Sequence, residues 1–471
     1  MADAAYFLRG RELAWSGQWV EAEAHFAARA DSDAHAALRH AEVAAFKTIL
    51  SGDKSFAERA IEAMDRADAL ALSEGGGRLK ALGRSTGLSS MSQRISGTLG
   101  LGDRAALEER QAQDAYISSL RAYASLHKAA LLLSTGKYAS GGLSLASSLA
   151  AFKGLPAAAP AAFEALDGAA AEAVRWRWCV AISIRRFGYG LFTIILSYAP
   201  SSMLFEGMLE LVTGMKLDVE LGLALLSAGA EETESVMAPH CAVFRAMIPA
   251  GRSQAYAPER RRETLERSFA LLSAELERLP TSPLFGMGLA AVLNLQGDID
   301  RKLQVTTAVY EQVRKDRTAA GDYLDVHGLS RFHRLGLELA LTHYTRRDLK
   351  AAVGFLEPLV AGESQYSARP LACALLAASH AALRDEVSAQ GYFALISRYA
   401  EGRVDRQIER RAQTMQRRKH LHLAYYELLM FRAYRLTPSA IAECMEELKS
   451  TEAAISQELA GIPKPELEEG E

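Results

Sequence analysis

Short turns recur along this chain and separate pairs of helix-forming segments. The clearest turns are Ser16-Gly17-Gln18, Ser51-Gly52-Asp53, Ser134-Thr135-Gly136, Gly297-Asp298 and Arg347-Asp348. The segments beside these turns have apolar residues at the spacing of one helix face, whereas the alternation typical of strands is scarce. The composition is also rich in Ala, Leu, Glu and Arg, which favour helices. We therefore predict an all-α fold.

The first pair of segments, over residues 6 to 29, follows the spacing of a tetratricopeptide repeat. Its large and small residues are Tyr6, Gly10, Leu13, Gly17, Trp19, Ala22 and Phe26. The small residues let two helices approach, and the large ones fill the groove between them. Residues 335 to 360 and 368 to 397 predict further pairs, although the repeat period drifts. The expected architecture is a superhelical solenoid of degenerate tetratricopeptide-like helix pairs, which can extend to 471 residues as one array.

Changes in composition divide the chain into six predicted segments. They are N-terminal tetratricopeptide-like pairs (1–72), a flexible Gly/Ser-rich basic insertion (73–104), a helical core (105–273), C-terminal tetratricopeptide-like repeats (274–398), basic terminal helices (399–460) and a disordered acidic tail (461–471). The insertion has no acidic residue between Glu74 and Asp103. A solvated loop fits this composition, and a weak basic amphipathic segment that touches an anionic lipid surface is the alternative.

The sequence contains no catalytic constellation. Ser85 lies in a G-x-S-x-G pattern, but that motif needs a strand before it and a helix after it, and neither is predicted here. His240 and Cys241 are adjacent, yet the sequence nominates no third or fourth metal ligand, so a satisfied core pair is the simpler interpretation. We expect a protein that is not an enzyme and holds neither a cofactor nor a metal.

The cysteines and the charge of the chain limit where the protein can be located and which partners it can bind. The four cysteines, Cys179, Cys241, Cys373 and Cys444, form no CxxC pair, which predicts reduced, buried thiols. The net charge is −3 with both signs interspersed, so no nucleic-acid partner is expected. A basic run over 403–419 predicts a solvated helix face. The N-terminus lacks the features of a secretory signal, which indicates a cytoplasmic protein.

The most apolar stretch of the chain lies at residues 175–247. Within it, positions 187–199 form a mostly apolar run of about thirteen residues that Gly188 and Gly190 interrupt. A membrane span needs about twenty residues. We therefore predict a core helix wrapped by its neighbours.

The same stretch contains a recognisable motif. Its residues are Arg186, Phe187, Gly188, Gly190, Leu191, Phe192 and Pro200, followed by Gly222, Pro239 and Cys241. They resemble the signature of the tetratricopeptide repeat protein 39 family, which includes the fungal inclusion-body clearance protein, also described as a mitochondrial outer-membrane relative. The likeness covers most of the chain and departs at Lys216-Leu217-Asp218, as in a divergent member. It implies an α-helical repeat array in which these motif residues are structural.

The resemblance and the absent chemistry together predict a non-enzymatic protein-binding scaffold. The family's roles are clearance of protein inclusions with links to lipid droplets in fungi, and lipid or ciliary roles in animals. The expected partner is a protein segment on the concave surface of the repeats. Peripheral contact with a lipid droplet or organelle membrane, and a nuclear location, stay open. The alternative is a carrier that holds a lipid or an apolar small molecule in a cavity near residues 187–208.

Overall fold

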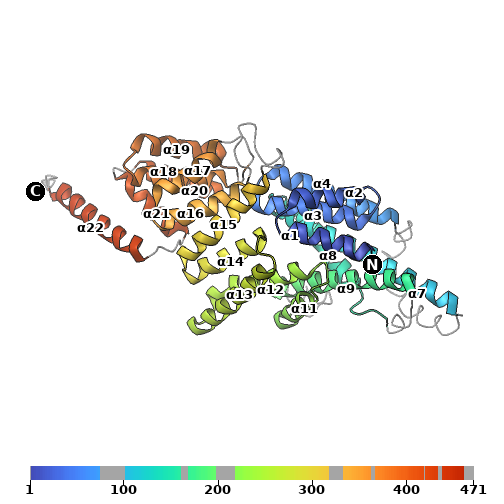
Figure 1. Cartoon of the computed structure of the whole chain (residues 1–471). Helices are drawn as coiled ribbons and strands as arrows, with labels where there is room; N and C mark the ends of the chain where they lie inside the picture. Colours follow the sequence, from blue (N-terminus) through green and yellow to red (C-terminus); the bar gives the residue numbers. More distant parts are fainter. Residues whose placement is uncertain are drawn as a thin grey trace, which may run out of the picture. The chain divides into compact units, whose positions relative to one another are not determined.

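Regular structure in this protein is helical (Figure 1). The computed structural model describes residues 2–74, 101–160, 168–197, 218–317, 332–361, 366, 368–401, 403–417, 420–432 and 438–460. Within those residues the one β contact is an isolated bridge between Asp53 and Tyr366. The prediction of an all-α fold is confirmed. Ser85, Pro200, the acidic tail and most of the predicted insertion lie outside the described residues.

The chain forms two compact units whose sequence segments interleave. The first unit comprises residues 1–296, 304–335 and 362–367, and the second comprises 297–303, 336–361 and 368–471. Two helices, α15 (Ile299–Arg317) and α16 (His333–Thr345), each contribute residues to both units. The six segments predicted from composition are finer than these units and stay a prediction.

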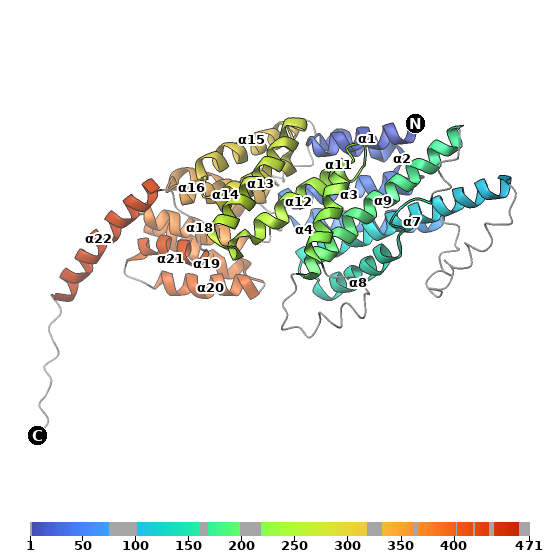
Figure 2. The same ribbon diagram turned by 90° about the horizontal axis from the view of Figure 1, so that it is seen from below.

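Neighbouring helices pack against one another in the first unit. Its helices are α1 (Ala2–Trp15), α2 (Trp19–Ala30), α3 (Ala34–Ser51), α4 (Lys54–Glu74), α7 (Leu101–Ser134), α8 (Tyr138–Gly154), α9 (Gly168–Ser197), α11 (Val219–Glu231), α12 (Ala238–Arg252), α13 (Pro258–Arg278) and α14 (Pro283–Gln296), with a short 3-10 turn at Ser253–Ala255. The pairs α3/α4 and α7/α8 are in extensive contact, and α9 packs on both α7 and α11. Figure 2 shows α7, α8 and α9 side by side. The helix pairs predicted on either side of Gly17, Gly52 and Gly136 are confirmed.

Small residues allow close packing in two of these pairs, as the sequence predicts for the first of them. A Cβ atom at Gly10 would overlap the ring of Phe26 and lie 2.8 Å from Cδ2 of His25. A Cβ atom at Gly141 would lie 3.2 Å from the backbone nitrogen of Leu133. Gly142 differs, because its Cβ position has no atom within 4 Å. Of the two adjacent glycines Gly141 and Gly142, only Gly141 therefore marks a close approach of another helix.

Helix α9 is much longer than the predicted apolar run. It has 30 residues and continues through Gly188 and Gly190. Its part Ala171–Ser197 is, among the described residues, the one helix long and apolar enough to cross a membrane, although 61% of the apolar window is buried inside the protein. The expectation that the run is too short to span was wrong. Burial by neighbouring helices, rather than length, is what favours a core position.

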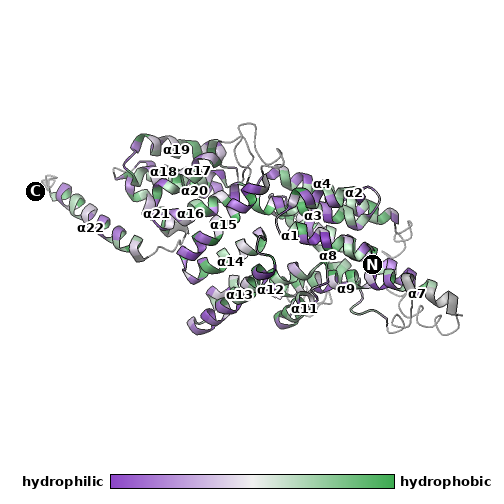
Figure 3. Ribbon diagram, in the orientation of Figure 1, coloured by the Kyte–Doolittle hydropathy of each residue, from purple (hydrophilic) through white to green (hydrophobic). Residues whose placement is uncertain are grey.

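The second unit continues the pattern of packed helices. It holds the remainder of α16 together with α17 (Leu349–Ala361), α18 (Arg369–Ala382), α19 (Glu386–Tyr399), α20 (Arg403–Gln416), α21 (Ala424–Arg432) and α22 (Pro438–Ala460), with a 3-10 turn at Leu421–Leu423. Helix α18 is central, since it contacts α17, α19, α20 and α21. In Figure 3 the ribbons of α18 and α19 contain both apolar and polar residues, whereas the composition of α20 is strongly polar. The predicted pairs at 335–360 and 368–397 are confirmed.

Six inter-helix turns use a residue in the left-handed region two positions before the next helix. These residues are Gly17, Gly52, Gly136, Gly297, Arg347 and Arg384, with φ of 78°, 65°, 81°, 84°, 63° and 67°. In four of the turns the next N–H bonds back to the carbonyl five residues earlier: Gln18 to Leu13, Lys137 to Leu132, Asp348 to His343 and Asp385 to His380, at 2.9–3.0 Å. This is the Schellman ending, which satisfies the last carbonyls of a helix. Arginine at two of these positions carries a backbone strain that glycine avoids.

Candidate functional site

The motif residues of α9 lie in the core of the first unit. Phe187, Leu191 and Phe192 are buried. The ring of Phe187 packs edge-on against Phe244, with centroids 5.5 Å apart. Gly188 faces Phe152 of α8, and a Cβ atom at this position would overlap that ring. The first half of the motif therefore lets α8 approach α9.

Two motif glycines form the crossing of α9 and α11. A Cβ atom at Gly222 would lie 2.7 Å from the carbonyl oxygen of Gly190, and one at Gly190 would lie 3.0 Å from the carbonyl oxygen of Gly222. Since backbone meets backbone here, no side-chain rotation can relieve a larger residue. These glycines fix how closely the two helices pack.

The remaining motif residues join α9 and α11 to α12. Arg186 forms an ion pair with Glu232, just after α11. The thiol of Cys241 faces Gly229, where a Cβ atom would lie 2.6 Å from Sγ, and burial raises the pKa of that thiol to about 12. Pro239 lies in the first turn of α12, where its missing N–H costs no helical hydrogen bond. Pro200 lies outside the described residues. The motif residues Phe187, Gly188, Gly190, Gly222 and Cys241 thus make contacts between neighbouring helices around α9.

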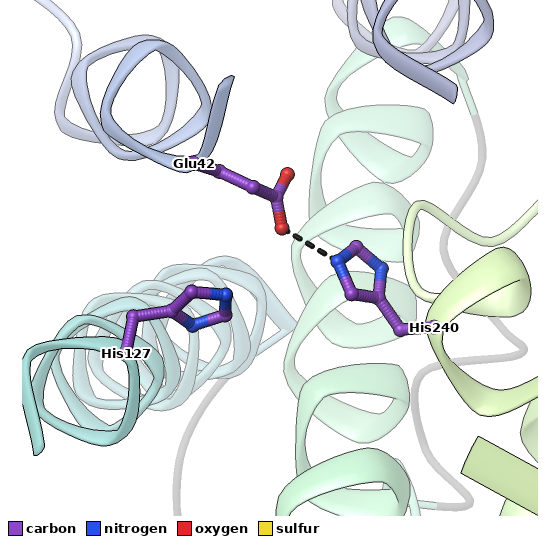
Figure 4. A group of neighbouring side chains, drawn as sticks. All are labelled: Glu42, His127 and His240. Carbon is purple, nitrogen blue, oxygen red and sulfur yellow. Dashed lines mark ion pairs between the residues drawn. The ribbon is translucent and has the colours of Figure 1, made fainter. Parts of the chain in front are cut away.

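A buried polar cluster lies beside this junction (Figure 4). We define the polar cluster as Arg39 and Glu42 of α3, Tyr123 and His127 of α7, and His240 of α12. Glu42 Oε1 accepts a hydrogen bond from the Tyr123 hydroxyl and lies 2.7 Å from His240 Nε2. Arg39 Nη1 donates to the other carboxylate oxygen at 2.9 Å. The side chains of Glu42 and His240 are only 5% and 4% exposed, so this charge lies deep in a helical core.

The charges of the polar cluster follow from burial and from the neighbours of Glu42. Burial alone would raise the pKa of Glu42, but Arg39 and His240 outweigh it and hold that pKa well below its ordinary value. Burial and the Glu42 carboxylate raise the pKa of Tyr123 well above its usual range. Burial lowers the pKa of His127 to about 4. At neutral pH the cluster therefore contains a carboxylate, a neutral phenol and a neutral His127 imidazole.

A hydrogen-bonded chain extends the cluster along α3 to Tyr116 of α7. Arg39 Nε donates to His35 Nε2 at 3.0 Å, and His35 Nδ1 lies 3.0 Å from the Tyr116 hydroxyl.

One nitrogen of the polar cluster is unpaired. Nδ1 of His240 is buried and has no hydrogen-bond partner among the described atoms. An unpaired buried nitrogen of this kind costs about 1–3 kcal/mol.

The sequence interpretation of His240 is confirmed in part. His240 and Cys241 were expected to be a satisfied core pair, and both are buried, but His240 Nδ1 has no partner among the described atoms. The Cys241 thiol faces Gly229, whereas His240 meets Glu42 and His127. These two residues are distant in sequence, so no local pattern joins them to His240. The one local signal was Arg39 and Glu42, an oppositely charged pair about one turn apart in helix α3. The expectation that all four cysteines are buried was also wrong for Cys179, which is exposed.

A second cluster of charged residues anchors the last helix of the second unit. Glu447 of α22 forms ion pairs with Arg347 and, at 3.4 Å, with Arg384. The Tyr426 hydroxyl donates to the same carboxylate at 2.5 Å. Both arginines are the left-handed residues that end α16 and α18. Helix α22 is thus attached to two inter-helix turns through one carboxylate.

Comparison with known proteins decides nothing further about the family. No protein-family model, no curated protein and no solved structure matches this chain. The likeness to the tetratricopeptide repeat protein 39 family therefore rests on the motif residues themselves.

Proposed function

We propose that this protein is a non-enzymatic scaffold, built as a superhelical solenoid of degenerate tetratricopeptide-like helix pairs, that binds a protein segment. The observation that carries the proposal is an internal correspondence in the second unit. Residues of the pair α16/α17 recur thirty-seven positions later in α18/α19: His343 and His380, Arg347 and Arg384, Asp348 and Asp385, Gly354 and Gly391, Phe355 and Tyr392.

The corresponding residues also make the same contacts. In each turn the histidine Nδ1 lies 3.1 Å from the carboxylate of the aspartate five residues later. In each pair the histidine ring stacks on the aromatic residue of the following helix, with centroids 5.6 Å and 5.4 Å apart. Chance similarity would not reproduce both the spacing and the contacts. This supports a repeat origin for the two pairs.

Helix α20 offers a surface for the partner. The side chains of Arg406, Arg410 and Arg411 are exposed on it, and Arg417, just after its last residue, is also exposed. A hollow of about 400 Å³ beside them is lined by Glu401, Arg406, Gln407 and Arg410. Guanidinium groups in such a hollow suit carboxylates of a protein segment, because each can bind a carboxylate through two hydrogen bonds. We propose that the partner presents an acidic segment here.

The packing of the central stretch favours the scaffold over a lipid carrier. The side chains of Phe187, Leu191 and Phe192 are buried against neighbouring helices, and Gly188 is in contact with Phe152. No observation on the described part of that stretch therefore favours a ligand cavity. The family resemblance suggests the context: protein quality control or inclusion clearance in the cytoplasm, at a lipid droplet or an organelle membrane.

A charge-reversal comparison tests the scaffold. The full chain, an Arg406→Glu/Arg410→Glu variant and an Arg262→Glu/Arg267→Glu control on α13 would each be used to capture proteins, and recovered proteins would be purified and titrated. The control carries the same charge change on another exposed helix. We expect to recover a partner that, once purified, binds the unmodified chain and the control with similar affinity. Its affinity for the Arg406→Glu/Arg410→Glu variant should be at least roughly 10-fold lower. Equal recovery by the two variants would contradict a partner site on α20.

A further inference from the structure

The polar cluster brings together side chains of the kinds that bind metal ions. We infer that Glu42, His127 and His240 together bind a divalent transition-metal ion of the zinc type. This inference stands apart from the proposed scaffold function, since it concerns the core of the first unit and needs no protein partner. One carboxylate and two imidazoles are a ligand set that zinc adopts in proteins. Nitrogen ligands favour zinc and its neighbours over magnesium or calcium.

The three ligand atoms already lie close together. One carboxylate oxygen of Glu42 and one ring nitrogen from each histidine are all within 4.8 Å of one another. Zinc bonds of about 2.0–2.2 Å place tetrahedral ligand atoms roughly 3.3–3.6 Å apart, so the site closes with side-chain movements of about 1 Å. Figure 4 shows the Glu42 carboxylate directed between the two imidazole rings. The ligands come from α3, α7 and α12, so the ion would join three helices.

Hydrogen bonds outside the ligand set orient two of the three ligands. His127 Nδ1 lies 3.4 Å from the Tyr123 carbonyl oxygen, which assigns the proton to Nδ1 and leaves the Nε2 lone pair for the ion. A backbone carbonyl on the far nitrogen is the usual support of a metal-bound histidine. Arg39 holds Glu42 Oε2, which leaves Oε1 on the side of His240. The carboxylate is thus prepared to bind through one oxygen.

Metal binding also requires a change of proton position on His240. In the hydrogen-bonded arrangement, His240 Nε2 donates to Glu42 Oε1, and the buried Nδ1 keeps an unused lone pair. Metal binding through Nε2 requires that proton to move to Nδ1, with no net loss from the ring. The Tyr123 hydroxyl, 3.0 Å from His240 Nε2, then lies next to the open fourth position. The cluster therefore has a metal-free state, in which hydrogen bonds join Glu42 and His240, and a metal-bound state, in which an ion joins them.

Metal titration of the full chain tests the inference. The protein would be stripped with a chelator and titrated with Zn²⁺ by calorimetry, and with Co²⁺ by visible absorption. The variant is His127→Gln, which removes one ligand and leaves the Glu42, His240 and Arg39 contacts in place. The matched control is His25→Gln, because His25 is a half-buried histidine of the same unit that bonds Tyr6. We expect one equivalent of Zn²⁺, a raised Tm, and at least a roughly 10-fold loss of affinity in His127→Gln only.

Several results would overturn the inference. One is the absence of stoichiometric Zn²⁺ binding to the stripped chain, and another is equal weakening in His25→Gln. Unchanged affinity in His127→Gln would do the same. If His127→Gln does not fold, the Co²⁺ spectrum of the unmodified chain decides. Visible bands of low-symmetry Co²⁺ that Zn²⁺ removes would support the site, and a spectrum identical to aqueous Co²⁺ would refute it.

Discussion

Among the glycines that the structure describes, Gly222 is the one whose Cβ position lies less than 3.0 Å from a backbone atom. Its Cβ position is occupied by the Ile194 side chain and lies 2.7 Å from the Gly190 carbonyl oxygen. Gly142, also within a helix of this unit, has no atom within 4 Å of its Cβ position. The two glycines thus have the same helical context and opposite steric environments. One marks a helix crossing, and the other is a position where alanine would stabilise the helix.

These environments predict opposite effects of one substitution. Gly222→Ala should lower the free energy of unfolding by about 1–3 kcal/mol, because the added methyl group meets backbone that cannot rotate away. Gly142→Ala should raise it by about 0.5–1 kcal/mol, since alanine reduces the entropy lost when the helix forms. Urea denaturation of both variants measures the difference. Equal effects would mean that the crossing of α9 and α11 is looser than described.

His127 predicts how the stability of the metal-free protein depends on pH. Its pKa is lowered from 6.5 to about 4, so the unfolded chain binds a proton first as the pH falls. Stability is therefore complete above pH 6.5 and declines between 6.5 and about 4. The loss is at most about 3 kcal/mol, because the ring is partly exposed. Glu42, whose pKa is lowered, adds a further loss in the same direction at more acidic pH.

The measurement is Tm against pH for the stripped chain and for His127→Gln. Glutamine does not titrate, so the variant should lose less stability between pH 6.5 and 4 than the unmodified chain does. Parallel profiles would show that another group causes the decline.

At the scale of elements, Glu447 determines the attachment of α22. Its side chain is 18% exposed and meets Arg347, which is 16% exposed. Glu443, one turn earlier, lies 3.7 Å from the same guanidinium but is 65% exposed. Partly buried charged hydrogen bonds contribute more than solvated ion pairs, because water screens the latter. We therefore expect Glu447 to contribute more than Glu443 to the attachment of α22, although both approach Arg347.

A matched pair of variants tests this difference. Glu447→Gln should weaken the attachment of α22 by about 1–3 kcal/mol, since Arg347 and Tyr426 lose their charged acceptor. Glu443→Gln should change it by less than about 0.5 kcal/mol. Hydrogen exchange of residues 438–460 reports the attachment directly. If exchange of these residues became faster in Glu443→Gln, or did not become faster in Glu447→Gln, other contacts would be responsible for the attachment of α22.

At the scale of the whole molecule, local patterns predicted the helices and turns, but not their long-range contacts. The glycine turns and the apolar spacing located α3 and α4 and the pairs that follow, because both signals act within one or two turns of chain. The predicted length of the apolar segment in α9 was wrong, because neighbouring helices stabilise a helix that continues through Gly188 and Gly190. The meeting of Glu42 with His127 and His240 depends on how three helices stack, and no local pattern encodes that arrangement.

The interleaved units predict how the chain responds to truncation. Residues 304–335 belong to the first unit, and there Val309, Val313, Phe332 and Leu335 are buried. A chain ending at residue 296 loses these side chains, each worth about 1.5–3 kcal/mol of burial, and exposes Trp19, whose ring packs 5.9 Å from Phe332. A chain ending at residue 367 keeps the first unit whole. We expect the longer fragment to melt cooperatively and the shorter one to unfold at a much lower temperature, as followed by circular dichroism. Similar melting of the two fragments would show that residues 1–296 fold without the segment that returns to them.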